Sequence, residues 1–172
     1  TLIPAEPWLF GYYAGMGYVP VFKYSSTTFT ASEVTIADET AVLNKINDYQ
    51  EESYHYLNQK LRERPYCIQH TETDFRVILA DLQLGEGYVY TLKQGDKITA
   101  LAIVYPAGST WQAGEIVAET PGMYPLLLQR ICEQLNIPSI RVISPSETEP
   151  APQVLGMARI INAKTILQLY AA

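Results

Sequence analysis

A run of apolar residues from Ile98 to Val104 constrains the fold more than any other feature of the sequence. It reads Ile-Thr-Ala-Leu-Ala-Ile-Val and scarcely alternates between apolar and polar residues. Near-continuous apolar strands are typical of a sheet covered on both faces. A second extended stretch, Tyr88–Leu92, precedes it, and the intervening Lys93–Lys97 carries Gly95 at its centre, which predicts a hairpin. We therefore expect a buried central strand paired with its neighbour in the sequence.

The elements around this hairpin predict the fold class. A third extended stretch follows at Trp111–Ala118, and a helix with an apolar stripe begins at Gly122. Apolar residues at steps of three or four predict a helix from Asp38 to Arg64, which Pro65 ends. Thr71–Asp74 resembles a capping box and predicts the start of another helix. Together these elements predict an α+β fold with a mixed, largely antiparallel central sheet flanked by helices.

Shorter elements are predicted at the two ends of the chain. In the N-terminal part they are the end of a strand at Leu2–Pro4, a helix over Trp8–Met16 and an extended segment over Tyr18–Phe29. In the C-terminal part they are a strand at Ile140–Ile143, a Pro- and Glu-rich linker at Ser144–Pro152, an extended segment at Met157–Ile161 and a helix at Ala163–Tyr170 with Asn162 as its N-cap.

Composition excludes several classes of protein. Of the 172 residues, 48% are apolar and 17% are charged, which is unlike a disordered chain. Lys and Arg number 12 and Asp and Glu 18, a balance of −6, so a nucleic-acid partner is not expected. No unbroken apolar run reaches the roughly 18 residues that a membrane span requires. We expect a globular chain with neither kind of partner.

Cysteine and histidine give no metal or nucleophile motif. Cys67 and Cys132 have no metal-ligand spacing, and Cys132 lies on the apolar stripe of its helix, which predicts a core position. His55 and His70 have no partner at a ligand or triad spacing. There is no phosphate-binding or dinucleotide-binding glycine motif and no secretory signal. We therefore expect no metal, and a reducing, cytoplasmic compartment.

The opening segment carries a family resemblance. Leu9, Phe10, Tyr13, Gly17 and Tyr18 match a helix that reads roughly L-F-x-x-Y-x-x-x-G-F near the end of an acetyltransferase domain of the GNAT superfamily, which this segment therefore resembles. The resemblance implies that Tyr13 is a general acid that protonates the departing thiolate of acetyl-coenzyme A. A phenol, with a pKa of about 10, stays protonated at neutral pH and can donate. The alternative is that Tyr13 belongs only to the Trp8–Met16 apolar stripe.

The rest of the chain resembles tandem-GNAT proteins of the enhanced-intracellular-survival type. The middle resembles their second GNAT-like domain, at Asp74-Phe75, Gly87–Tyr90, Ile98–Leu101 and Gly114–Val117, with Ala100 where the family often has Gly. Gly156–Leu167 resembles the first strand and helix of their sterol-carrier-protein-like domain. The glycines at 85, 87, 95, 108, 114 and 122 never fall into the Gln/Arg-x-x-Gly-x-Gly/Ala pattern of the loop that holds the pyrophosphate in this superfamily.

The resemblance implies a division of the chain and two alternative functions. Residues 1–24 would end one GNAT domain, 25–154 would form a second without a pyrophosphate loop, and 155–172 would begin a sterol-carrier-protein-like domain. The chain would then be an internal fragment of an N-acetyltransferase, inactive alone, whose cosubstrate is acetyl-coenzyme A and whose acceptor is a small-molecule or peptide amine. Glu6, Trp8 and Phe10 would lie near the acceptor. The alternative is a non-catalytic ligand-binding or protein-interaction module; a homo-oligomer is possible in either case.

Overall fold

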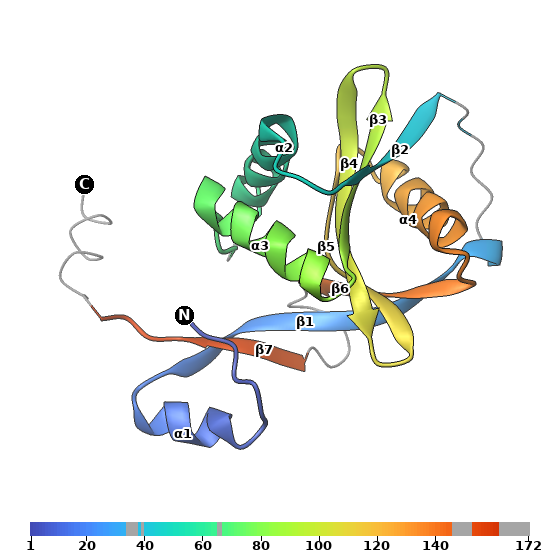
Figure 1. Cartoon of the computed structure of the whole chain (residues 1–172). Helices are drawn as coiled ribbons and strands as arrows, with labels where there is room; N and C mark the ends of the chain where they lie inside the picture. Colours follow the sequence, from blue (N-terminus) through green and yellow to red (C-terminus); the bar gives the residue numbers. More distant parts are fainter. Residues whose placement is uncertain (34–37, 39, 65–66, 146–152, 162–172) are drawn as a thin grey trace. The chain divides into compact units, whose positions relative to one another are not determined.

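Strand β4 (Lys97–Ala107) lies inside a mixed sheet, as its apolar sequence predicts (Figure 1). The structure is a computed structural model that describes residues 1–33, 38, 40–64, 67–145 and 153–161. Its seven strands are ordered β2-β3-β4-β5-β6-β1-β7. Four pairs of neighbours are antiparallel, β2–β3, β3–β4, β4–β5 and β1–β7, whereas β5–β6 is parallel. This confirms the mixed, largely antiparallel sheet. The other strands are β1 (Val19–Thr30), β2 (Ala41–Ile46), β3 (Tyr88–Gln94), β5 (Thr110–Ala118), β6 (Ser139–Pro145) and β7 (Gln153–Ala158).

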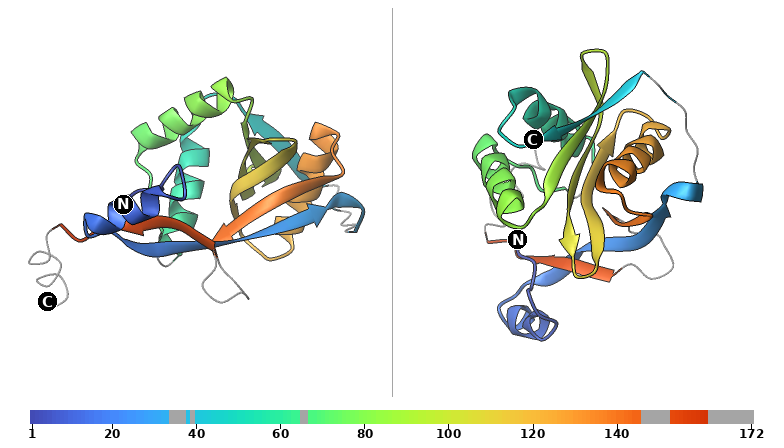
Figure 2. Two further views of the ribbon diagram at one scale, coloured as in Figure 1. Left: turned by 90° about the horizontal axis from the view of Figure 1, so that it is seen from below. Right: turned by 45° about the vertical axis from the view of Figure 1, so that its right-hand side comes forward.

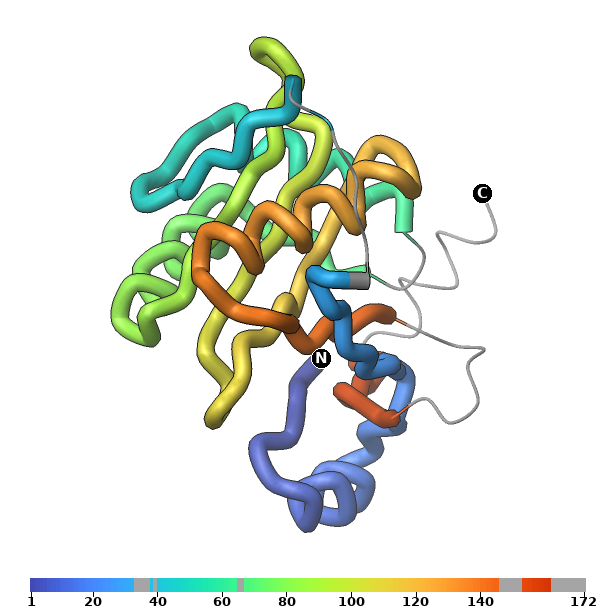
Figure 3. The backbone as a smooth tube through the Cα atoms, turned by 90° about the vertical axis from the view of Figure 1, so that its right-hand side faces the viewer, coloured from blue at the N-terminus to red at the C-terminus, as the bar shows by residue number. Residues whose placement is uncertain are grey.

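Helices cover both faces of the sheet at β4. Helix α4 (Met123–Leu135) packs on the face that carries Ala100, Ala102 and Val104. Helices α2 (Glu51–Arg62) and α3 (Glu72–Leu84) pack on the opposite face, against Leu101 and Ile103. Figure 3 shows α4 in front of the strands, with α2 and α3 behind them. The absence of apolar–polar alternation in β4 therefore follows from burial of both faces, as expected.

Two compact units make up the chain. One contains residues 26–144, and the other contains 1–25 and 145–172. In the second unit, the first part of β1 pairs with β7, from Val19 opposite Ala158 to Tyr24 opposite Gln153 (Figure 2). Leu2 forms a further antiparallel bridge with Met157 through two backbone hydrogen bonds of 3.0 and 2.9 Å. This unit is thus built from both ends of the sequence. The division at 24 and 154 into parts of three domains stays a prediction.

Helix α1 (Leu9–Gly15) belongs to the same unit as β7. It ends at Met16, and Gly17 follows with φ of +83°, the left-handed conformation that favours glycine. The Arg159 guanidinium donates a 2.8 Å hydrogen bond to the Met16 carbonyl oxygen. A residue that follows β7 therefore fixes the carbonyl end of a helix near the other end of the sequence.

The predicted helix from Asp38 to Arg64 is wrong in its first half. Residues Ala41–Ile46 form β2, which pairs antiparallel with β3 from Ala41 opposite Gln94 to Ile46 opposite Val89. Spacing of Leu43 and Ile46 fits a helical stripe, but the neighbouring strand offers a complete ladder of backbone partners. Tertiary pairing thus overrides local periodicity in this segment.

The predicted helices at Trp8–Met16 and from Gly122, and the strands predicted at Tyr18–Phe29, Tyr88–Leu92, Trp111–Ala118 and Ile140–Ile143, are present. Three predictions are wrong in their bounds: the strand end at Leu2–Pro4 is a single bridge at Leu2, the segment predicted at Met157–Ile161 is a strand at Gln153–Ala158, and Ser144 and Pro145 of the predicted linker belong to β6. The linker residues 146–152 lie outside the described residues.

Thr71 and Asp74 form the reciprocal capping box, with the Thr71 N–H donating to the Asp74 carboxylate at 2.8 Å. Cys132 is 1% exposed in the core beneath α4. The helix predicted at Ala163–Tyr170, with Asn162 as its cap, lies outside the described residues. None of the helices in the described ranges is long and apolar enough to cross a membrane.

Candidate functional site

Tyr13 lies on α1, with its ring half-buried between two other tyrosines. The ring centroids are 5.3 Å from Tyr12 and 5.9 Å from Tyr18, in edge-to-face geometry. Such pairs stabilise the orientation of a ring without engaging the phenol oxygen. The ring of Tyr13 is thus held in place by its neighbours, and its role as a general acid stays a prediction.

Glu6, Trp8 and Phe10 occupy the turn and first residues of the same helix. Trp8 is the N-cap residue and is 69% exposed, Glu6 is exposed, and Phe10 is half-buried. The Glu6 carbonyl oxygen accepts a 3.0 Å hydrogen bond from the Leu9 N–H, so its carboxylate is not needed for the turn. The three side chains share one short segment with Tyr13, and their role at an acceptor site stays a prediction.

A second group of polar residues gathers where β5 and β6 separate, within the 26–144 unit. The two strands pair in parallel at only two positions, Gln112 with Arg141 and Ala113 with Val142. At the next residue, Gly114, the antiparallel register with β4 shifts: Ile103 is opposite Glu115, whereas Val104 is opposite Ala113. Gly114 is therefore the extra residue of a β-bulge, which bends a strand and increases its twist.

Glycine at the bulge leaves room for the ring beside it. A Cβ on Gly114 would lie 2.8 Å from both Cε1 and Oη of Tyr105. The phenol oxygen of Tyr105 in turn accepts a 2.6 Å hydrogen bond from the Gln112 side-chain amide. The pairing of β5 with β6 thus ends at a backbone distortion that a single small residue permits.

Arg64 extends from the end of α2 to the far side of this bulge. Its Nη1 donates to Oε1 of Glu115 at 2.5 Å, and its Nη2 donates to the backbone oxygen of Ile116. The Arg64 and Glu115 side chains are 26% and 23% exposed, so the ion pair is largely shielded from water. A second ion pair lies beside it: Nζ of Lys60 is 3.3 Å from Oε2 of Glu119.

Two titratable groups accompany Arg64. Burial raises the pKa of the Tyr124 phenol on α4, while a hydrogen bond with Ser144 of β6 and the charge of Arg64 oppose that rise. Burial and the Glu115 carboxylate raise the pKa of the Cys67 thiol, and Arg64 again opposes. Both groups are held in their neutral forms at neutral pH. The cluster can donate hydrogen bonds, but it does not supply an activated nucleophile.

The loop from β5 to α4 does not fit a diphosphate. The Glu119 N–H is engaged by the Thr99 oxygen at 2.8 Å, and the Met123 N–H by the Thr120 oxygen at 3.1 Å. Pro121 has no N–H, and the Glu119 carboxylate adds a negative charge. A diphosphate cradle needs several free backbone N–H groups at the start of a helix. This strand–loop–helix therefore cannot replace the missing glycine-rich loop.

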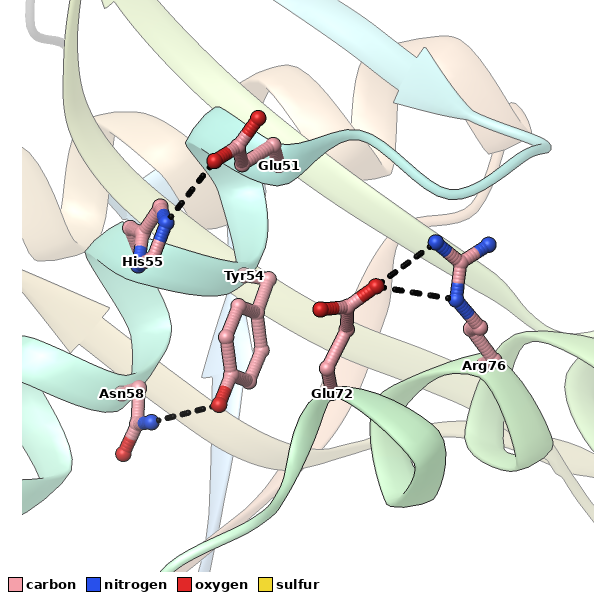
Figure 4. Close-up of polar contacts among 6 residues, drawn as sticks. All are labelled: Glu51, Tyr54, His55, Asn58, Glu72 and Arg76. Carbon is pink, nitrogen blue, oxygen red and sulfur yellow. Dashed lines mark hydrogen bonds and ion pairs between the residues drawn. The ribbon is translucent and has the colours of Figure 1, made fainter.

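A pocket of about 220 Å³ opens between the end of β2 and α3. Its wall includes Asp48, Tyr49, Arg76 and Gln83. The Arg76 guanidinium lies 3.5 Å from the centre of the Tyr49 ring. It also donates a 2.8 Å hydrogen bond to Oε1 of Glu72 (Figure 4). Burial and the Glu72 charge raise the pKa of Tyr49. The guanidinium at this pocket is thus already engaged by Glu72 and by the Tyr49 ring.

Neither histidine belongs to a metal site. Nε2 of His55 lies 3.3 Å from Oε1 of Glu51 one turn earlier, at the surface of α2 (Figure 4). The backbone oxygen of His70 accepts a bond from the Tyr54 phenol at 3.4 Å. Within the described ranges, no three His, Cys, Asp or Glu side chains are grouped as metal ligands would be.

Sequence reasoning missed the Arg64 cluster although one part of its signal was visible. Glu115 and Glu119 are four residues apart, on β5 and just after it, and such a spacing places both on one side of an extended segment, a pattern that also fits a solvent-facing edge. Lys60 and Arg64 are also four residues apart and lie at the end of a helix. The two bases and the two acids thus have the same spacing and opposite charges. This pattern predicts that α2 packs against β5.

Comparison with known proteins establishes a likeness of fold. No protein-family model matches this sequence, and the search of curated proteins gave no match. Three solved structures superpose on most of the chain. A conserved protein from Enterococcus faecalis V583, described as a probable N-acyltransferase, has a TM-score of 0.64 at 15% identity over 98% of this chain and 46% of that one. A GCN5-related N-acetyltransferase from Kribbella flavida has a TM-score of 0.58 at 11% identity, over 91% and 41%. Eis1 from Mycobacterium abscessus has a TM-score of 0.58 at 10% identity, over 96% and 48%.

These matches define the architecture and its extent. The chain spans less than half the length of each of the three proteins. At identities of 15% or less, the likeness concerns the fold and not the activity. The chain has the α+β fold of GCN5-related N-acetyltransferases, as the sequence resemblance implied.

Proposed function

We propose that this chain is an internal part of a GNAT N-acetyltransferase that transfers acetyl from acetyl-coenzyme A to a small-molecule or peptide amine. The observation that carries the proposal is the extent of the structural likeness. Acetyl- or acyltransferase structures match 91–98% of this chain, while the chain accounts for 41–48% of their length. The remaining part of such a protein would contain the pyrophosphate loop. Within residues 1–172 the letters of that loop occur at Gln153–Ala158, and this segment forms strand β7.

In this proposal, residues 1–24 end the first GNAT domain, 25–154 form the second, and 155–172 begin a sterol-carrier-protein-like domain. Tyr13 is the general acid that protonates the departing thiolate after the amine attacks the thioester carbonyl. Glu6, Trp8 and Phe10 lie beside the acceptor amine. Exposure of Trp8 and Glu6 at the start of α1 is compatible with that position. The misfit of the β5–α4 loop to a diphosphate favours a second domain that serves as scaffold and pocket wall.

The same misfit favours one alternative, a non-catalytic GNAT-like module that binds a ligand or partner protein. The two functions differ in whether any acetyl transfer depends on Tyr13. The experiment compares the 172-residue chain with the longest polypeptide that its reading frame encodes. Release of the coenzyme A thiol is followed with acetyl-coenzyme A and a panel of amines.

We expect no turnover by the 172-residue chain and measurable turnover by the longer polypeptide. In the longer polypeptide, Tyr13→Phe lowers kcat by about 10²-fold or more, the usual contribution of a general acid. Tyr12→Phe changes a neighbouring, exposed ring of α1 and leaves kcat unchanged. Turnover by the short chain alone, or an equal effect of the two substitutions, contradicts the proposal. A reading frame with no added coding sequence and no turnover supports the binding module.

A further inference from the structure

Helix α1 has few contacts of its own that would hold it in a fixed position. It has seven residues, Leu9–Gly15, none of which is buried, and no side chain caps its N-terminus. Helices of this length are marginal in water and depend on tertiary contacts. Because Tyr13 lies on this helix, the contacts that fasten α1 also determine the orientation of the Tyr13 phenol.

The contacts that fasten α1 gather at its carboxyl end. The Tyr13 carbonyl oxygen accepts hydrogen bonds from the Met16 N–H at 3.0 Å and from the Tyr18 N–H at 3.1 Å. The Gly17 N–H donates to the Ala14 oxygen at 3.0 Å. These bonds close the turn that follows the helix and connect the backbone of Tyr13 to Tyr18, the residue that precedes β1.

Gly17 makes this turn easy to distort. Its φ is +83°, and glycine adopts either sign of φ about equally well, so the peptide planes beside it rotate with little resistance. The Met16 carbonyl and the Gly17 N–H belong to one planar peptide group. The 2.8 Å hydrogen bond that Nη1 of Arg159 donates to the Met16 oxygen therefore also fixes the direction of the Gly17 N–H. A donor from outside the helix thus holds the turn at its most flexible position.

Strand β7 places Arg159 at this turn. Ala158 is opposite Val19 of β1, and both the N–H and the carbonyl oxygen of Met157 are hydrogen-bonded to Leu2. The segments that precede and follow α1 in the sequence therefore both pair with the strand that ends just before Arg159. The position of Arg159 is thus set by backbone pairing within the unit that contains α1.

We propose that Arg159 is a positioning residue for Tyr13: its guanidinium holds the last turn of α1 in one conformation and so keeps the phenol in one orientation. The consequence for acetyl transfer rests on the proposed function, in which Tyr13 protonates the departing thiolate. A proton donor has to lie within hydrogen-bond reach of the leaving sulfur, so a displacement of α1 slows that step although the donor is still present. Arg159 acts through the backbone of the turn and transfers no proton itself.

Amide hydrogen exchange resolved by residue tests the fastening in the 172-residue chain, where no activity is needed. Arg159→Met keeps an apolar stem and removes the donors, and Lys23→Met is the matched control, since it removes an exposed positive charge from β1 in the same unit. In Arg159→Met, the Gly17 and Tyr18 amides are expected to exchange about fivefold faster or more, because their bonds lie in the turn that the guanidinium holds. The Met157 amide, which is bonded within the sheet, keeps its protection in both variants.

Kinetics of the longer polypeptide test the consequence for Tyr13. Arg159→Met is expected to lower kcat about tenfold and to leave KM for acetyl-coenzyme A within about twofold, since the loss affects proton transfer and not binding. Arg159→Lys keeps one charged donor and is expected to recover most of the lost kcat. In a Tyr13→Phe background, Arg159→Met is expected to change kcat by less than about twofold, because the group that it positions is absent.

The outcomes separate this inference from the proposed function. Unchanged exchange of the Gly17 and Tyr18 amides in Arg159→Met overturns the inference, whatever the activity. An equal loss of kcat with and without the Tyr13 phenol also overturns it, since Arg159 would then act on stability alone. Acetyl transfer that does not depend on Tyr13, together with faster exchange in Arg159→Met, contradicts only the proposed function and supports the fastening of α1 by Arg159.

Discussion

Replacing Gly114 with alanine tests whether the β-bulge determines the stability of the sheet. The added Cβ would lie 2.8 Å from Cε1 and Oη of Tyr105 and 3.2 Å from its Cζ. Ordinary contact begins at 3.4 Å, so the ring must move by about 0.6 Å (3.4 − 2.8). That movement also disturbs the 2.6 Å bond from Gln112 to the Tyr105 phenol oxygen.

Overpacking of this kind costs about 1–3 kcal/mol of the free energy of unfolding. For a domain of this size, each kcal/mol lowers Tm by about 2–4 °C, so Gly114→Ala is expected to lower Tm by about 2–12 °C. Thermal unfolding followed by circular dichroism measures the change. The matched control is Gly122→Ala, because no heavy atom lies within 4 Å of its added Cβ and its φ is −73°. The control is expected to stay within about 1 kcal/mol of the unmodified chain.

A double variant identifies the cause of the loss. Tyr105→Ala removes the atoms that the new Cβ meets, so the cost of Gly114→Ala measured in that background is expected to fall by at least about 0.5 kcal/mol. Equal stability of Gly114→Ala and Gly122→Ala would refute the reasoning. An undiminished cost in the Tyr105→Ala background would show that the ring is not what requires glycine.

Three further predictions concern stability and thiol chemistry. Thr71→Ala removes the N-cap of α3 and is expected to cost about 0.5–2 kcal/mol of the free energy of unfolding at neutral pH, measured by urea unfolding. The hydrogen bonds from Thr71 hold the pKa of Asp74 below its usual value, so the stability that they contribute is lost as the pH falls through that lowered pKa. An equal loss of stability on substitution at pH 2 and at pH 7 would contradict this prediction. Burial raises the pKa of Tyr90 to about 12, so its contribution to stability is complete below pH 10 and is lost as the pH rises toward 12; Tyr90→Phe should flatten the alkaline fall in Tm over that window. Burial raises the pKa of the Cys132 thiol to about 11, and that side chain is 1% exposed, so a disulfide reagent at pH 8 should modify Cys67 alone in the native chain and both thiols in denaturant.

The sheet was predictable wherever one physical constraint dominates the local sequence. Burial on both faces leaves Ile98–Val104 with almost no polar residue, and a short turn with Gly95 at φ of +59° joins it to β3. The capping box at Thr71–Asp74 is likewise a local interaction, complete within four positions of the chain. Ala41–Ile46 was predicted wrongly because its conformation depends on β3, which lies more than forty residues away in the sequence.

The predicted site residues and the observed Arg64 cluster also differ in how far apart their members lie in the sequence. Tyr13 and Phe10 were predicted from a local motif that contains both, and Glu6 and Trp8 from their place just before it in the same short segment; the roles of all four stay predictions. The cluster combines Arg64 with Glu115, which are 51 positions apart and have no shared motif. Only the finished packing of α2 against β5 brings the two charges together.

The packing of α2 on β5 nevertheless follows from the repeat lengths of a helix and a strand. Four residues advance a helix by about 6 Å and return to the same face, while four residues advance a strand by about 13 Å and also return to the same face. Lys60 and Arg64 can therefore reach Glu119 and Glu115 only if their long side chains splay apart along the strand. The structure has this arrangement, with Lys60 bonded toward Glu119 and Arg64 toward Glu115. Reversing one charge alone, with Arg64→Glu, would place a second carboxylate beside Glu115 and remove the donor to the Ile116 oxygen, so it is expected to destabilise the packing of α2 on β5. These polar contacts thus orient α2 on the sheet.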